Sequence, residues 1–158
     1  MLKLIKCEFL KLKRKKFIPL IILAAFLFPI PLTYLMTTPS MMERYTDQAD
    51  AFDGLFNMVL GYGIQFLLPC IIGVIAAILF FMERDNDTFK NLRTIPVTST
   101  QMVLAKIVVL FLFGIVFCVA STIATILCGF GTLEVYGTGY KLFLAVETGI
   151  FITAGTLP

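Results

Sequence analysis

The stretch from residue 54 to residue 82, GLFNMVLGYGIQFLLPCIIGVIAAILFFM, contains 29 residues and no charged side chain. A helix of about 20 apolar residues crosses the hydrocarbon core of a bilayer, so this stretch can span a membrane with some tilt. Two more charge-free runs cover 17–36 and 107–133, and a fourth begins at Leu142. A lipid-exposed backbone must satisfy its own hydrogen bonds, and the runs lack strand-like alternation. The sequence therefore predicts an all-α, polytopic helical membrane protein with three complete spans and part of a fourth.

The composition of the chain excludes a water-soluble domain. Apolar residues make up 59% and charged residues 15%, and the mean hydropathy is +0.95, whereas soluble domains are about 45–50% apolar and about 25% charged. Histidine is absent, which excludes histidine metal ligands and a histidine general base. The four cysteines have no metal-ligand spacing, and we interpret them as packing residues. We therefore expect no metal site, no catalytic residue and no cofactor bound by this chain.

The basic residues are unevenly distributed, and their distribution predicts the orientation of the chain. Of the 13 lysines and arginines, seven lie in 1–16 and four in 83–106, whereas 37–53 contains Arg44 alone and 131–141 contains Lys141 alone. Short cytoplasmic loops of membrane proteins are enriched in lysine and arginine. The amino terminus and the loop after the second span are therefore predicted to be cytoplasmic, in a plasma membrane.

These patterns divide the chain into eight predicted segments. In the first, Ile5 and Phe9 share an apolar face opposite basic residues, which is typical of a helix lying on an anionic leaflet; a plain positive-inside anchor is the alternative. The segments are a cytoplasmic interfacial amphipathic helix (1–16), the first span (17–36), an extracellular loop (37–53), the second span (54–82), a cytoplasmic loop (83–101), the third span (102–130), a second extracellular loop (131–141) and the start of a fourth span (142–158).

Prolines and small residues within the runs predict kinked, closely packed helices. Proline removes a helical hydrogen bond, and small residues four apart let helix backbones approach each other. The prolines are at 19, 29, 31 and 69, and the small residues are Gly73 with Ala77, and Ala120 with Ala124 and Cys128. We interpret them as packing within one bundle; a dimer interface and a translocation path are the alternatives.

The cytoplasmic loop, ERDNDTFKNLRTIPVTSTQMVLAK over 83–106, contains a predicted short helix. Asp87 can cap a helix over 88–94, and Pro96 disfavours its continuation. Phe89 and Leu92 share one face of that helix, so they could insert into a groove on a soluble partner. A solvated connector is the alternative interpretation.

The same loop resembles a known family. Its residues resemble the "E, T, L, P-V-S/T, A/G-K" string between the second and third spans of type 2 ABC exporter permeases, at Glu83, Thr88, Leu92, Pro96, Val97, Thr98, Ala105 and Lys106. Together with the basic start MLKLIKCEFLKLKRKKF, the pattern is most similar to the lantibiotic-immunity and bacitracin-resistance branch.

The resemblance implies a six-span permease subunit in which 88–94 is the coupling helix on an ATPase subunit. The expected coupling residues are Glu83, Thr88, Phe89, Leu92 and Pro96. The chain lacks the P-loop pattern GxxxxGK[ST], so ATP is expected on the separate partner subunit and this chain is not expected to be an enzyme. A second permease copy or a paralogue is the other protein partner implied.

Acidic residues are candidates for contact with substrate. Segment 37–53 has one base and four acids, a formal charge of −3, and would attract a cationic peptide. The acids are Glu43, Asp47, Asp50 and Asp53. Positive-inside topology alone also leaves acids outside. Ser40 with Glu43 matches a capping box and predicts a short helix in this loop.

Glu147 lies within the fourth apolar run. A charged residue at the centre of a membrane helix costs about 2.5 to 3.5 kcal/mol, and less near the interface, so it should face protein or water. We interpret Glu147 as an interfacial or packed glutamate, or as a substrate or gating contact.

The leading hypothesis is a permease subunit of an ABC exporter that protects a bacterial cell against an antimicrobial peptide. The alternative is a non-transporting membrane scaffold that recruits a soluble protein through 83–101. An intramembrane enzyme is disfavoured because no histidine or pair of acids lies within a span. We expect membrane lipid as a partner and no nucleic acid, because membrane attachment accounts for the basic segment.

Overall fold

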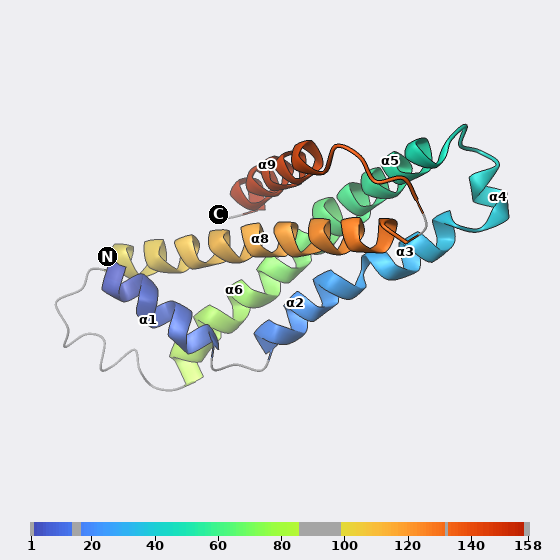
Figure 1. Ribbon diagram of the computed structural model, residues 1–158. Helices are drawn as coiled ribbons and strands as arrows, with labels where there is room; N and C mark the ends of the chain where they lie inside the picture. Colours follow the sequence, from blue (N-terminus) through green and yellow to red (C-terminus); the bar gives the residue numbers. More distant parts are fainter. Residues whose placement is uncertain (1, 14–16, 86–98, 132, 157–158) are drawn as a thin grey trace.

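A computed structural model describes residues 2–13, 17–85, 99–131 and 133–156, and the description below is confined to them (Figure 1). The described chain is built from helices, which confirms the all-helical membrane fold expected from the sequence. The helices are α1 (Leu2–Lys13), α2 (Phe17–Leu27), α3 (Pro29–Met36), α4 (Pro39–Met42), α5 (Gln48–Met58), the π-helix η1 (Val59–Leu67), α6 (Leu68–Asp85), α8 (Ser99–Gly129) and α9 (Thr138–Thr156).

Three of the described segments are long and apolar enough to cross a membrane. They are Pro19–Met36, Gln48–Phe81 and Thr100–Gly129. The second has 34 residues, which is about 51 Å of helix and exceeds a hydrocarbon core of about 30 Å. The helix therefore extends beyond the core, and part of the predicted loop over 37–53 is the helix α5.

The second span contains a π-helix between two α-helices. Pro69 follows η1 and has no N–H group to donate to the carbonyl of Gln65, and the wider π-helical turns directly before it accommodate this break. Gly63 lies against the ring of Phe28 in the first span, where a Cβ atom would be 2.9 Å from a ring carbon. The glycine thus allows the two spans to approach closely.

The first span is divided at Phe28 into α2 and α3. Pro29 and Pro31 lack N–H donors, whereas the N–H of Phe28 still donates to the carbonyl of Ala24 over 3.0 Å. The short helix α4 then begins at Pro39 with Thr38 before it, and no side chain caps it. The capping box expected from Ser40 and Glu43 does not form, because proline at the first helical position starts the helix one residue before Ser40.

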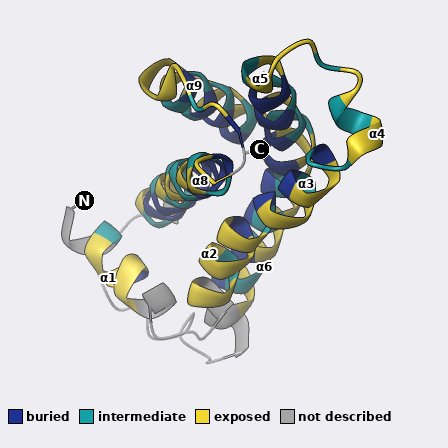
Figure 2. Cartoon of the chain, turned by 45° about the vertical axis from the view of Figure 1, so that its right-hand side comes forward, coloured by how far each residue is buried: buried dark blue, intermediate teal, exposed yellow. Residues whose placement is uncertain are grey.

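The helix α8 is the centre of the bundle and packs against α9, α2, α1, α3 and α6. Figure 2 shows buried residues facing the space between the helices and exposed residues on the outer faces of α1, α2 and α9. The largest core contains Ile64, Leu68, Ile72, Ile75, Leu79, Val109, Leu110 and Phe117. Ala124 and Thr125 of α8 are also buried, so this part of the row of small residues packs within the bundle.

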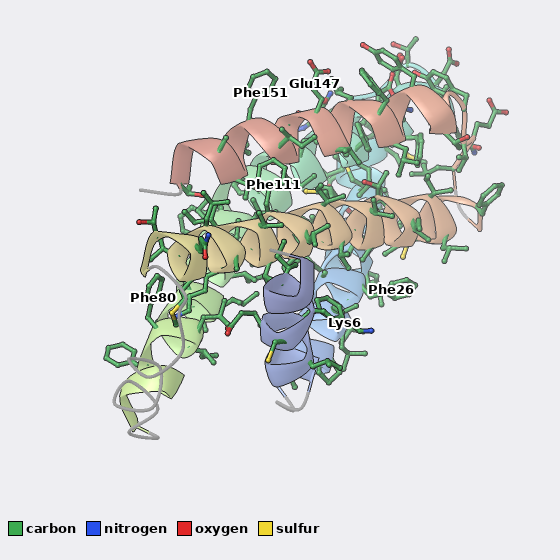
Figure 3. The ribbon with its side chains drawn as sticks, turned by 90° about the vertical axis from the view of Figure 1, so that its left-hand side faces the viewer. Lys6, Phe26, Phe80, Phe111, Glu147 and Phe151 are labelled. Carbon is green, nitrogen blue, oxygen red and sulfur yellow. The ribbon has the colours of Figure 1, made fainter. Side chains whose placement is uncertain are left out.

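The amphipathic helix α1 lies against α8. Ile5 packs against the core, and the ring of Phe9 stacks on Phe113 with 5.9 Å between centroids. Glu8 is buried, whereas Lys6 projects away from the bundle (Figure 3). The apolar face predicted from Ile5 and Phe9 is therefore the face that contacts the protein.

Candidate functional site

A buried lysine joins α9 to α5 at the end of the bundle that carries 37–53, which we call the acidic end. Lys141 is 6% exposed, and its Nζ atom lies 2.6 Å from Oδ1 of Asp53. The sequence placed Lys141 in the loop 131–141, but α9 begins at Thr138 and includes it. The buried ammonium group of Lys141 is stable there only if further contacts replace its lost hydration.

Aromatic rings supply those further contacts. The Nζ atom lies 4.1 Å from the ring centroid of Phe52 and 4.0 Å from that of Tyr136. At such distances each ring attracts a cation by about 0.5 to 2 kcal/mol, depending on exposure. The hydroxyl of Tyr136 donates a hydrogen bond to Oδ2 of Asp53. Phe52, Asp53 and Tyr136 therefore enclose one ammonium group, and we call these three residues the lysine cage.

The hydrogen bond between Tyr136 and Asp53 also changes the acidity of the phenol. It raises the pKa of Tyr136, because ionisation would remove the donated proton and place a second anion beside Asp53. The phenol is therefore held in its neutral, hydrogen-bond-donating form.

Two glycines let the chain form this cage. A Cβ atom at Gly129, the last residue of α8, would lie 2.7 Å from a ring carbon of Phe52, so glycine allows the ring to approach the helix end. Gly137 has φ +62°, which favours glycine, and its carbonyl accepts the N–H of Lys141 over 3.0 Å. The turn at Gly137 thus starts α9 in the position that brings Lys141 to α5.

An open groove of about 650 Å³ lies beside the cage. Its lining residues are Arg44, Tyr45, Thr46, Asp50, Asp53, Gly54, Asn57, Met58 and Tyr62. The ring of Tyr45 crosses α5 at Gly54, where a Cβ atom would lie 2.5 Å from the hydroxyl oxygen. Asp53 belongs to both the groove and the cage, and its side chain is 42% exposed.

The structure places two of the four predicted outer acids in this groove. Asp50 and Asp53 line it from α5. Asp47 precedes α5 and is exposed, and Glu43 ends α4 and is also exposed; neither lines the groove. Asp53 is paired with Lys141. Glu43, Asp47 and Asp50 have no lysine or arginine partner among the described residues.

Glu147 lies apart from this groove. It projects from α9 away from α8, as does Phe151 (Figure 3). Its side chain is exposed, so it is not packed within the described bundle. An interfacial glutamate and a substrate or gating contact remain as the two interpretations.

Of the predicted coupling residues, the structure describes one, at the opposite end of the bundle, where α6 ends and α8 begins and which we call the basic end. Glu83 is in the last turn of α6, whereas Thr88, Phe89, Leu92 and Pro96 lie outside the described residues. Two charged residues of the helices are buried: Lys106 of α8, with Nζ 4.5 Å from the ring centroid of Phe80, and Glu8 of α1. The helices α6 and α8 therefore fix the positions at which the loop 83–101 leaves and re-enters the bundle.

Lys141 and Tyr136 are the functional candidates that the sequence did not single out. One signal was available. Asp53 directly precedes the second apolar run and Lys141 directly precedes the fourth, and the predicted topology places both residues on the extracellular side of the membrane. Opposite charges at such borders can pair. The aromatic partners carried no comparable signal, because 16 phenylalanines and 5 tyrosines are spread through the chain.

The fold defines a polytopic helical membrane protein with acidic residues gathered at one end of the bundle. The family model of the ABC-2 family transporter protein matches residues 4–158, and the chain belongs to this family. It is thus a membrane permease of the ABC transporter class, a transport component that associates with an ABC ATPase. No curated protein and no solved structure matches the chain.

Proposed function

We propose that this permease belongs to an exporter that moves a cationic, amphipathic antimicrobial peptide away from a bacterial plasma membrane and so gives immunity or resistance. The observation that carries the proposal is the groove at the acidic end, where Asp50 lies among Tyr45, Met58 and Tyr62. Carboxylates attract basic side chains, and aromatic rings bind both apolar groups and cations. Such a lining fits a peptide that has both characters.

The proposal places the amino terminus and the loop 83–101 in the cytoplasm. The sequence contains no P-loop, so an ATPase subunit supplies ATP binding and hydrolysis. That subunit docks on the loop through Phe89 and Leu92, and a second permease copy or a paralogue completes the pathway. ATP then shifts the permease between states that differ in accessibility.

Growth inhibition by peptides of graded charge tests the proposal. The cells carry the full transporter with either the natural permease or the variant Glu43→Gln/Asp47→Asn/Asp50→Asn, which leaves Asp53 and the lysine cage intact. We expect resistance to fall by about 10-fold for the most basic peptides and to change little for neutral ones, and the deficit should shrink as salt rises. Membrane abundance is quantified in parallel.

A matched control exchanges an exposed neutral residue of α5 that does not line the groove, Gln48→Ala, and should leave resistance unchanged. A loss that is independent of peptide charge and salt would contradict electrostatic capture. If the natural transporter protects against no peptide at all, the substrate belongs to another chemical class.

A further inference from the structure

We propose that the lysine cage is a binding site for one ammonium or guanidinium group, which the chain's own Lys141 fills in this state and which a substrate cation takes during transport. The inference rests on the proposed export of a cationic substrate and identifies the contact that such a substrate would replace. It concerns Lys141, Phe52, Asp53 and Tyr136.

The chemistry of the cage is that of a cation site. One carboxylate oxygen of Asp53 lies 2.6 Å from Nζ of Lys141, and two ring centroids lie at 4.0 and 4.1 Å from the same atom. A carboxylate with flanking aromatic faces binds alkylammonium and guanidinium groups by charge-assisted and cation–π contacts. The residues recognise the terminal group of Lys141, and they would recognise the same group on another molecule.

The cage opens toward the groove through Asp53. The side chain of Lys141 is 7% exposed, whereas that of Asp53 is 42% exposed and lines the groove. A cation that enters the groove beside Asp50 therefore reaches Asp53 from the side opposite to the bundle interior. It competes with Lys141 for this carboxylate.

Competition for Asp53 has a consequence for α9. Without its carboxylate, Lys141 would be a buried charge that faces only aromatic rings, which is unfavourable compared with hydration. The lysine then leaves the cage, and the first turn of α9 separates from α5. Occupation of the groove and release of α9 are thus linked equilibria, each favouring the other.

Chemical complementation tests whether the cage binds a free cation. In Lys141→Ala, purified with its ATPase partner in lipid nanodiscs, n-propylammonium replaces the missing side-chain end, which is three carbons and the ammonium group. We expect it to raise the Tm of this variant by at least about 2 °C at saturation, because a ligand that binds the folded state stabilises it. Neutral n-propanol at the same concentration, and n-propylammonium with the natural protein, should give no such rise.

The double variant Lys141→Ala/Asp53→Asn is the matched control. It keeps the vacated space but lacks the carboxylate, so n-propylammonium should not stabilise it. An equal rise in Tm in the single and double variants, or no rise in the single variant, would overturn the cation site.

A labelling experiment on the natural sequence keeps the proposal testable if Lys141→Ala does not fold. An amine-acylating reagent is applied to the complex in nanodiscs, and modification of Lys141 is quantified by mass spectrometry. N-acetyl tetra-arginine amide is the probe, because guanidinium groups do not consume the reagent. We expect the probe to increase labelling of Lys141 several-fold, and N-acetyl tetraglycine amide to leave it unchanged.

Labelling of Lys141 that does not respond to the arginine probe would overturn the competition. Neither experiment depends on transport. If both tests give the expected result but no cationic peptide is exported, the cation site stands and the proposed function is refuted. If a cationic peptide is exported but neither test gives a response, the cation site alone is refuted.

Discussion

Gly149 of α9 lies directly against Cys118 of α8, so close that a Cβ atom at position 149 would overlap the sulfur atom. A second contact of this kind joins the same helices at Gly114, where a Cβ atom would lie 2.7 Å from Oγ1 of Thr153. Small residues allow helices in a membrane to pack closely, and here they hold α9 against the central helix.

Gly149→Ala should therefore destabilise the bundle. Overpacking typically costs about 1 to 3 kcal/mol, and the severe overlap with the sulfur atom places this exchange in the upper part of that range, above the gain of about 1 kcal/mol from the higher helix propensity of alanine. Cys118→Ala should restore part of the loss in the double variant, because it removes the sulfur. Thermal unfolding in detergent measures the stability of the single and the double variant. Gly155→Ala in the same helix, where a Cβ atom meets nothing within 4 Å, is the control and should cause no loss; an equal loss there would refute the contact.

The orientation of the chain can be measured with single cysteines in a cysteine-free background. An impermeant thiol reagent on intact cells should label a cysteine at Asp47 and not one at Asn91, because eleven of the thirteen basic residues lie in 1–16 and 83–106. Both positions should react after permeabilisation. Labelling of position 91 in intact cells would reverse the orientation and remove the basis for docking through 83–101.

Phe89→Ala should weaken the association with the ATPase partner. Truncating a buried aromatic at a small interface typically costs about 2 kcal/mol or more, which corresponds to roughly a 30-fold loss of affinity. Lys90→Ala, on another face of the predicted helix, should have a much smaller effect. The amount of ATPase subunit that co-purifies with the permease compares the two variants. Equal amounts with Phe89→Ala and Lys90→Ala would identify the loop as a solvated connector.

Glu147→Gln separates the two interpretations of this residue. The exchange keeps the size of the side chain and removes its charge, and membrane abundance should stay normal because the side chain is exposed. Normal abundance with lost resistance would identify a substrate or gating contact, whereas unchanged resistance would identify an interfacial glutamate. Resistance and permease abundance are measured in the same cells.

Hydropathy placed the third span at 102–130 from one continuous apolar run, and the helix α8 covers Ser99–Gly129. The start of the second span was less predictable. Asp50 and Asp53 interrupt the apolar run, but helical hydrogen bonding begins at Gln48, since charges mark where a helix leaves the hydrocarbon and not where it ends.

The lysine cage could not be derived from the sequence. Asp53 and Tyr136 are 83 positions apart, and their contact depends on how α5 packs beside α9. The sequence identified Asp53 as one of four equivalent acids, whereas the structure distinguishes it by its pairing with Lys141. Pro69 indicated a kink in the second span, but it did not specify a π-helix.

The length of α8 has a mechanical consequence. Its 31 residues form one uninterrupted helix of about 46 Å, which begins beside the loop 83–101 and ends at Gly129 against Phe52 of the lysine cage. A rigid rod of this length acts as a lever: a tilt of about 10° around its midpoint displaces each end by about 4 Å in opposite directions. Phe52 lies against the far end of α8, so a small rotation of α8 at the basic end shifts the surface on which this ring of the lysine cage packs.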